Sequence, residues 1–156
     1  MTLPYRPNVC MLVIDTHGRI LLNQERGEER VMWKFPQGGV EKGETDEEAI
    51  RRELEEEVRI THYSILAKAH YIHRYDWSEA MQKRKGYRGQ EQHVYLIRSH
   101  RPTEARPGEE KIIQTQWIPF EEALQLFTNP KQIKASKTIW KEFGPIAKKG
   151  GTPLKK

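Results

Sequence analysis

The segment GGVEKGETDEEAIRRELEEEVRI, residues 38–60, carries the strongest structural and chemical signals in the chain. Thr45 and Glu48 have the spacing of a capping box, which predicts that a helix begins at residue 45. Apolar residues then recur every four positions and would give the helix one buried face: Ile50, Leu54 and Val58. We therefore expect an amphipathic helix over residues 45–58, entered through two consecutive glycines whose backbone can approach a ligand closely.

Two glutamates of this helix have no basic partner. Glu53 and Glu57 lack a basic residue three or four positions away, and both lie on the same face as Glu56. Like-charged neighbours of this kind destabilise a helix by ~0.2–0.5 kcal/mol per pair. A divalent cation would reverse the effect, because Mg²⁺ binds carboxylate oxygens together with water and phosphate oxygens. The residues alone leave two interpretations open, a metal-binding face and an ordinary solvated acidic face.

The spacing within this segment resembles the signature of the Nudix hydrolase family. That signature reads Gly, five residues, Glu, seven residues, Arg-Glu, an aliphatic residue, any residue, Glu-Glu, any residue, Gly and an aliphatic residue. The matching positions are Gly38, Glu44, Arg52, Glu53, Leu54, Glu56, Glu57 and Ile60. Arg59 departs from the signature, which has glycine there. A helix often turns left-handed at this point, a conformation that costs a non-glycine residue roughly 1 kcal/mol or more.

The resemblance implies hydrolysis of a diphosphate linkage by water, with Mg²⁺ or Mn²⁺ as cofactor. It implies that Glu53 is a metal ligand and general base, that Arg52 orients the carboxylates by ion pairing, and that Glu44 is a structural brace. The metal ligands it implies are Glu53, Glu56, Glu57 and the carbonyl of Gly38. A further acidic ligand is expected ahead of the strand that contains Trp117. For that ligand we favour Glu110, with Glu109 and Glu91 as alternatives.

Three further segments narrow the resemblance to the branch that contains RNA pyrophosphohydrolases and dinucleoside polyphosphate hydrolases. They are YRPNV at residues 5–9, WKFPQGG at residues 33–39 and GQEQ at residues 89–92, where the branch usually has Lys in place of Glu91. The resemblance implies that pyrophosphate is removed from the 5′-triphosphate end of RNA to leave a 5′-monophosphate. Phosphate contacts and stacking on aromatic rings would hold such a substrate. The substrate-binding residues that we expect are Arg6, Gln37, Gly39, Tyr75, Lys85, Arg88, Gln90 and Gln92.

Two other functions agree with the same residues. The site would equally hydrolyse diadenosine polyphosphates or (deoxy)nucleoside triphosphates, because the signature defines the reaction and not the group that carries the phosphates. A module of the same fold that binds RNA without cleaving it is the second alternative. Such modules usually lack signature glutamates, and this chain has all of them.

The rest of the chain predicts an α+β fold, an α/β/α sandwich in which a mixed sheet is flanked by helices. The strands that we expect cover residues 8–15, 19–24, 31–35, 65–75, 92–99 and 112–118, and further helices cover residues 119–127 and 134–143. A basic loop is expected before Gln90. One domain over residues 1–147 would be followed by a basic tail, residues 148–156, and we expect disorder from Gly144 onward.

Composition excludes several classes of protein. The 156 residues carry a formal net charge of +5, yet residues 38–58 alone carry −6 and residues 148–156 carry +4. The longest apolar run, Val9 to Ile14, is too short to span a bilayer, so no membrane association is expected. No secretory signal is visible at the N-terminus, and a single cysteine excludes an internal disulfide framework. We therefore expect a cytoplasmic protein whose acidic helix is surrounded by basic surface.

Overall fold

A mixed β-sheet organises the chain in a computed structural model that describes residues 2–27 and 29–148. Its strands are β1 (Tyr5–Ile14), β2 (Ile20–Arg26), β3 (Val31–Lys34), β4 (Gln37–Gly39), β5 (Tyr63–Asp76), β6 (Gly89–Ser99) and β7 (Ile112–Ile118). The helices are α1 (Asp46–Val58), α2 (Glu79–Lys85), α3 (Phe120–Leu126) and α4 (Pro130–Lys148), with a short 3₁₀ helix, η1, at Pro102–Glu104.

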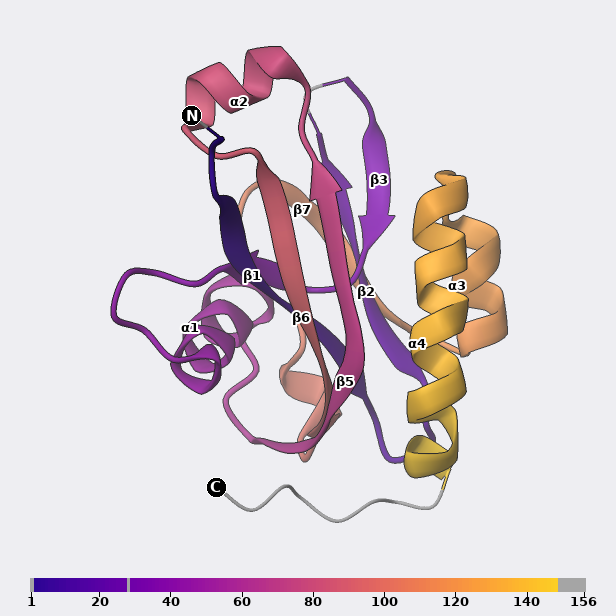
Figure 1. The fold of residues 1–156 in the computed structure, drawn as a ribbon. Coiled ribbons are helices and arrows are strands. Elements are labelled where there is room, and N and C mark those ends of the chain that lie inside the picture. The colour runs from indigo at the N-terminus through magenta and orange to yellow at the C-terminus, as the bar shows by residue number, and fades with distance from the viewer. Residues whose placement is uncertain (1, 28, 149–156) are drawn as a thin grey trace.

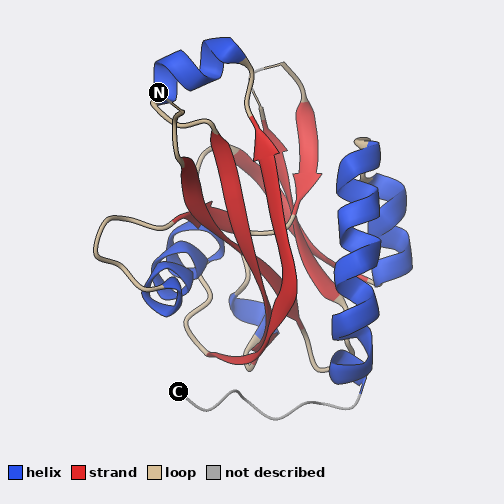
Figure 2. Cartoon of the chain, in the orientation of Figure 1, coloured by secondary structure: helices blue, strands red, loops and turns tan. Residues whose placement is uncertain are grey.

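The strand order is β3-β2-β1-β6-β5, with β4 added to β1 and β7 added to β2. Strands β1 and β6 are parallel, and the other pairs are antiparallel. Helix α1 lies on one face of the sheet, whereas α3 and α4 cover the other (Figure 1). Helix α2 lies beyond one end of the sheet, near the start of β1 (Figure 2). This arrangement confirms the predicted sandwich of helices around a mixed sheet.

Strand β1 separates two apolar cores because alternate side chains point to opposite faces. One set packs beneath α1: Val9, Met11 and Val13. The other set packs beneath α3 and α4: Cys10, Leu12 and Ile14. Burial on both faces explains why the sequence of β1 reads as a continuous apolar run and not as an alternating pattern.

The predicted start and end of α1 are confirmed. The Thr45 side chain accepts a hydrogen bond from the backbone N–H of Glu48, and the Glu48 side chain accepts one from the backbone N–H of Thr45. At the other end Arg59 is left-handed, with φ 60° and ψ 26°. Both ends of the helix are therefore defined by local interactions.

Three details differ from the sequence-based expectation. The basic loop before Gln90 contains helix α2, and residues 37–39 form strand β4 because they pair with β1. Helix α4 continues to Lys148 through Pro145, so the disorder expected from Gly144 is wrong for residues 144–148. Burial of Gly144 and Ala147 against the rest of the protein supports these last turns. The remainder of the predicted tail, residues 149–156, lies outside the described residues.

Within the described part of the chain, no helix has the length and apolar character needed to cross a membrane.

Candidate active site

Strand β4 and helix α1 meet where Gly38 faces Glu53. A Cβ atom built on Gly38 would lie 2.0 Å from the Cδ atom of Glu53, so no other residue type fits without displacing that carboxylate. The next glycine, Gly39, is crowded by Arg6, whose Nη2 would lie 2.3 Å from a Cβ atom there. The two glycines therefore allow an acidic and a basic side chain to contact the same short strand.

The guanidinium of Arg52 joins α1 to the turn that precedes it. Its Nε and Nη2 donate to the Glu44 carboxylate at 2.9 and 2.8 Å, and Nη2 also donates to the Gly39 carbonyl at 2.9 Å. Its Nη1 donates to Glu53 Oε1 at 2.6 Å. The hydrogen bonds from Arg52 lower the pKa of Glu44 to about 2. Glu44 thus lies where a brace is expected, and Arg52 fixes the orientation of Glu53.

Glu57 is the most buried carboxylate of the helix, with 1% of its surface exposed. Its Oε1 accepts a hydrogen bond from the backbone N–H of Gln37 at 3.2 Å. Burial, followed by repulsion from Glu25, raises the pKa of Glu57 to about 8. Burial also raises the pKa of Glu53 against the opposing effect of Arg52, and repulsion from Glu56 and Glu109 adds smaller contributions in the same upward direction. The site therefore holds more negative charge than its own cations balance.

These oxygen donors fit a hard divalent cation, since such a cation would neutralise carboxylates that are otherwise costly to bury together. Glu56 has 54% of its side chain exposed and would have to turn toward the other two. No three His, Cys, Asp or Glu side chains within residues 2–27 and 29–148 already stand in a metal-binding arrangement. The carboxylates are gathered on one helix face, and a cation would complete their arrangement.

The loop before β7 brings one further acid toward this face. The backbone N–H of Gly108 donates to the Glu57 carbonyl at 2.8 Å, which holds the loop against the end of α1. The next residue, Glu109, contributes to the negative charge felt by Glu53. Glu110, which the sequence favours, has an exposed side chain, and its carbonyl accepts a hydrogen bond from Arg26.

The other alternative, Glu91, lies on β6 and forms an ion pair with Arg74. It contributes to neither the pKa of Glu53 nor that of Glu57. Of the three acids considered outside the helix, the structure therefore brings Glu109 toward Glu53 on α1.

Glu25 is a buried acid at the site that the sequence analysis missed. It lies on β2, is 5% exposed, and repels Glu57. The predicted strand ended at residue 24, one residue too early to include it. Alternation along that strand was the available signal, because Glu25 lies on the same side as Leu21, which packs beneath α1.

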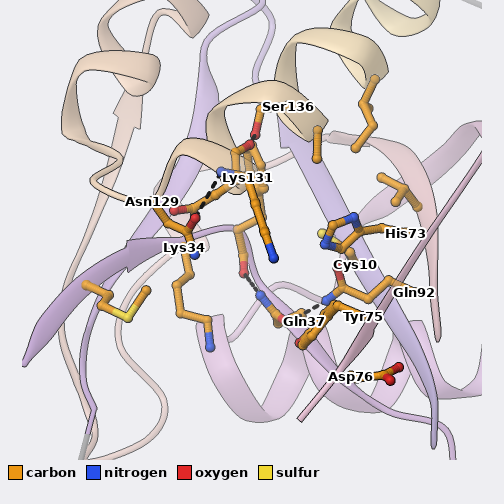
Figure 3. Close-up of a pocket in the computed structure, with 16 residues that line it drawn as sticks. Cys10, Lys34, Gln37, His73, Tyr75, Asp76, Gln92, Asn129, Lys131 and Ser136 are labelled. Carbon is orange, nitrogen blue, oxygen red and sulfur yellow. Dashed lines mark hydrogen bonds between the residues drawn. The ribbon is translucent and has the colours of Figure 1, made fainter. Parts of the chain in front are cut away.

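A cavity of about 420 Å³ lies on the opposite face of β4, between the sheet and α4 (Figure 3). Three of the expected substrate-binding residues line it: Gln37, Tyr75 and Gln92. The Gln92 amide donates to Gln37 Oε1 at 2.7 Å and to Asn8 Oδ1 at 3.0 Å. Tyr75 donates from its hydroxyl to Gln90 Oε1 at 2.6 Å, which places Gln90 at the edge of this group. The cavity therefore combines aromatic rings with amides.

Two positive side chains also line the cavity, Lys34 from β3 and Lys131 from α4. In Figure 3 the ring of His73 lies beside the cavity, and its centroid is 5.2 Å from that of Tyr75. Sequence reasoning identified neither lysine, because each lies in a different element and only the fold brings them together.

Two other expected substrate-binding residues, Lys85 and Arg88, lie outside the cavity near α2. The Lys85 ammonium lies 5.7 Å from the centroid of the Trp77 ring. The Arg88 guanidinium lies 5.1 Å from the centroid of the Tyr5 ring and pairs with Asp76 at 3.1 Å. Because Asp76 also lines the cavity, this basic surface begins at the cavity's edge.

Comparison with known proteins gives one consistent result. A family model described as the NUDIX domain matches residues 4–139. The chain is 41% identical over 98 residues to an RNA pyrophosphohydrolase of Halorhodospira halophila, a match that covers 60% of this chain and 53% of that protein. It is 28% identical over 149 residues to an RNA pyrophosphohydrolase of Rickettsia conorii, covering 92% of each chain. The match thus spans about half of the first relative and nearly all of the second.

Solved structures show the same fold. The Escherichia coli dihydroneopterin triphosphate pyrophosphohydrolase aligns with a TM-score of 0.66 at 18% identity, covering 86% of this chain and 96% of that one. A Caenorhabditis elegans Ap4A hydrolase, solved as a binary complex, aligns with a TM-score of 0.68 at 16% identity, covering 90% and 98%. At these identities the likeness concerns the fold alone.

Proposed function

The chain belongs to the Nudix family, and on this basis we propose that it is a pyrophosphohydrolase that uses Mg²⁺ or Mn²⁺. Its substrate is the 5′-triphosphate end of RNA, which it converts into a 5′-monophosphate with release of pyrophosphate. The observation that carries the proposal is the position of Gln37. Its backbone N–H binds Glu57 on the acidic side of β4, while its side chain lines the cavity on the other side.

A nucleoside in the cavity would therefore have its phosphates next to the acidic face. Glu53 accepts a proton from the attacking water, and Arg52 keeps the Glu53 carboxylate in position for that transfer. A divalent cation held there would neutralise charge at the phosphates and lower the pKa of the water. Glu56, Glu57 and the Gly38 carbonyl would complete the set of oxygens that hold the cation. Water adds to a phosphorus of the linkage between the α- and β-phosphates, the P–O bond of that linkage breaks, and pyrophosphate leaves.

RNA is favoured over smaller substrates by the surface beyond the cavity. Arg88 pairs with Asp76 at the cavity edge, and Lys85 is the last residue of α2; both would contact the backbone of the following nucleotides. Tyr75 offers an aromatic face for a base, and Arg6 lies against Gly39, near the phosphates. The names of the H. halophila and R. conorii relatives support the same substrate. We also place the protein in the cytoplasm, in keeping with its unpaired and buried cysteine, Cys10.

The decisive experiment is a competition between triphosphorylated RNA, diadenosine tetraphosphate and ATP in one reaction with Mg²⁺, followed by identification of all products. We expect RNA to be consumed first, with pyrophosphate and 5′-monophosphorylated RNA as products. If diadenosine tetraphosphate or ATP is cleaved first, that compound and not RNA is the preferred substrate. Absence of metal-dependent hydrolysis of any of them would favour the RNA-binding module.

A pair of variants on α1 tests the catalytic assignment. Glu53→Gln should lower the rate by ~10²-fold or more, because the general base is lost. Glu55→Gln is the matched control, since Glu55 is exposed on the same helix and lies at an unspecified position of the signature. Near-normal turnover by Glu53→Gln would contradict the assigned mechanism.

A further inference from the structure

Two lysines converge on one buried carboxylate at the edge of the acidic site. Glu25 lies on β2, which pairs with β3 on one side and with β7 on the other. Strand β3 supplies Lys34, whose Nζ is 4.0 Å from Glu25 Oε1. Lys111, immediately before β7, approaches the same oxygen at 3.6 Å. The order of the strands therefore sets the two ammonium groups on either side of Glu25.

Exposure distinguishes this group from an ordinary ion pair. The Glu25 side chain is 6% exposed, whereas the side chains of Lys34 and Lys111 are 34% and 49% exposed. The second carboxylate oxygen of Glu25 is buried and has no hydrogen-bond partner in the described part of the chain. Two ammonium groups meet the one carboxylate of Glu25, and the ammonium groups are the ones open to solvent. A buried carboxylate that fixes two accessible ammonium groups is arranged to bind an anion.

The position of the two lysines indicates which anion. Lys34 lines the cavity that would hold the nucleoside. Lys111 lies toward the catalytic side, 4.0 Å from Glu109, and its charge interacts with that of Glu57. The line from Lys34 to Lys111 thus runs from the cavity toward the catalytic glutamates. A phosphate chain attached to the nucleoside would follow the same line.

We propose that Lys34 and Lys111 bind the substrate's phosphate chain between the cavity and the catalytic glutamates, and that Glu25 is the positioning residue that holds both. The inference rests on the proposed function and specifies how that site recognises a polyphosphate. Ammonium groups bind phosphate oxygens through charge-assisted hydrogen bonds, which form without a divalent cation. Binding through this lysine pair is therefore measurable separately from hydrolysis.

Calorimetric titration of inorganic tripolyphosphate into the protein in EDTA tests the pair. Lys34→Gln and Lys111→Gln should each weaken binding by roughly tenfold, as expected for loss of one charge-assisted contact. Lys141→Gln, an exposed lysine on α4, is the control and should bind like the unchanged protein. Lysine variants that bind as tightly as this control would overturn the proposal.

The variant Glu25→Gln distinguishes a role of Glu25 in positioning the lysines from the effect of its negative charge alone. Removing a negative charge would by itself strengthen anion binding, but the proposal requires weaker binding because both lysines lose their anchor. The double variant Glu25→Gln/Lys111→Gln should lose less binding than the two single effects combined, because the part of the Glu25 effect that acts through Lys111 is already lost. Tighter binding by Glu25→Gln, or a fully additive double variant, contradicts a positioning role. If Glu25→Gln does not fold, the two lysine variants still decide whether the pair binds phosphate.

Hydrolysis assays on the same variants keep the two proposals apart. The lysine variants and Glu25→Gln should raise the KM for triphosphorylated RNA more than they lower kcat. A protein that binds tripolyphosphate through the lysines but hydrolyses nothing contradicts the proposed function and leaves the lysine pair intact. An active enzyme whose KM and tripolyphosphate binding are unchanged in all three variants contradicts only the lysine pair.

Discussion

Arg52 donates a hydrogen bond to Glu53, the next residue along the same helix, at 2.6 Å. Adjacent residues on a helix do not normally face each other. The contact forms because the Arg52 guanidinium lies over the start of the helix, where Glu44 and the Gly39 carbonyl hold it. Through Arg52, the orientation of the Glu53 carboxylate thus depends on Glu44 and Gly39, which precede the helix.

This arrangement predicts a large effect for a conservative change. In Arg52→Lys, one ammonium cannot replace a planar group that binds Glu44, Gly39 and Glu53 together. We expect kcat/KM to fall by ~10²-fold because the carboxylate is misplaced. Arg51→Lys is the matched control on the neighbouring, exposed position. Equal kinetics for the two variants would contradict the role given to Arg52.

Helix α1 was predictable because its signals are local in sequence. Strand β4 was not, because it depends on pairing with a strand that is distant in sequence. The capping box and the apolar period of α1 lie within one segment of sequence. Strand β4 is three residues long and exists because Gly39 pairs with Asn8 in β1. Helix α2 buries none of its residues, so it has no apolar period to detect. Its ends were nevertheless marked by Ser78 and Gly86, which cap it.

The same distinction applies to the site. The signature placed the acidic face correctly on α1 because its residues are neighbours in sequence. The choice between Glu109 and Glu110 as the acid nearer to Glu53 depends on the course of the loop before β7. The hydrogen bond from Gly108 to the Glu57 carbonyl holds that loop against α1. Glu25 and its two lysines come from three different elements, so only the sheet order brings them together.

Stability in acid should depend on Glu104. Burial opposes ionisation of this carboxylate, but hydrogen bonds from Thr61 and His62 outweigh it and lower the pKa from 4.5 to about 2. Because the pKa is lower in the folded protein, the stabilisation is complete above pH 4.5 and disappears as the pH falls toward 2. Glu104→Gln should therefore lower Tm at pH 7 and have little effect near pH 2. Thermal melts from pH 7 to pH 2 test this prediction. If the Tm of Glu104→Gln stays equally far below that of the unchanged protein in acid, the stabilisation does not come from the ionised carboxylate.

Arg59→Gly should stabilise the protein. Arg59 is the one non-glycine residue with positive φ in the described part of the chain, and relief of this strain is worth roughly 1 kcal/mol. For a chain of this size that corresponds to a rise in Tm of ~2–4 °C. Arg59→Ala keeps the Cβ atom and loses the hydrogen bond to the Gly108 carbonyl, so it should show no gain. Activity should be unchanged in the glycine variant. A lower Tm for Arg59→Gly than for the alanine control would contradict the strain argument.

The acid outside α1 can be identified by comparing two adjacent substitutions. Glu109 adds to the negative charge at Glu53, whereas Glu110 points its side chain to solvent. Glu109→Gln should therefore weaken Mn²⁺ binding, measured by electron paramagnetic resonance of the free ion, by roughly tenfold. Glu110→Gln should leave it unchanged and serves as the control for loss of one negative charge from the same loop. If Glu110→Gln weakens Mn²⁺ binding and Glu109→Gln does not, the ligand is Glu110, which the sequence favours. That result would require the loop held by Gly108 to rearrange when the cation binds, because its present course directs Glu109 and not Glu110 toward Glu53.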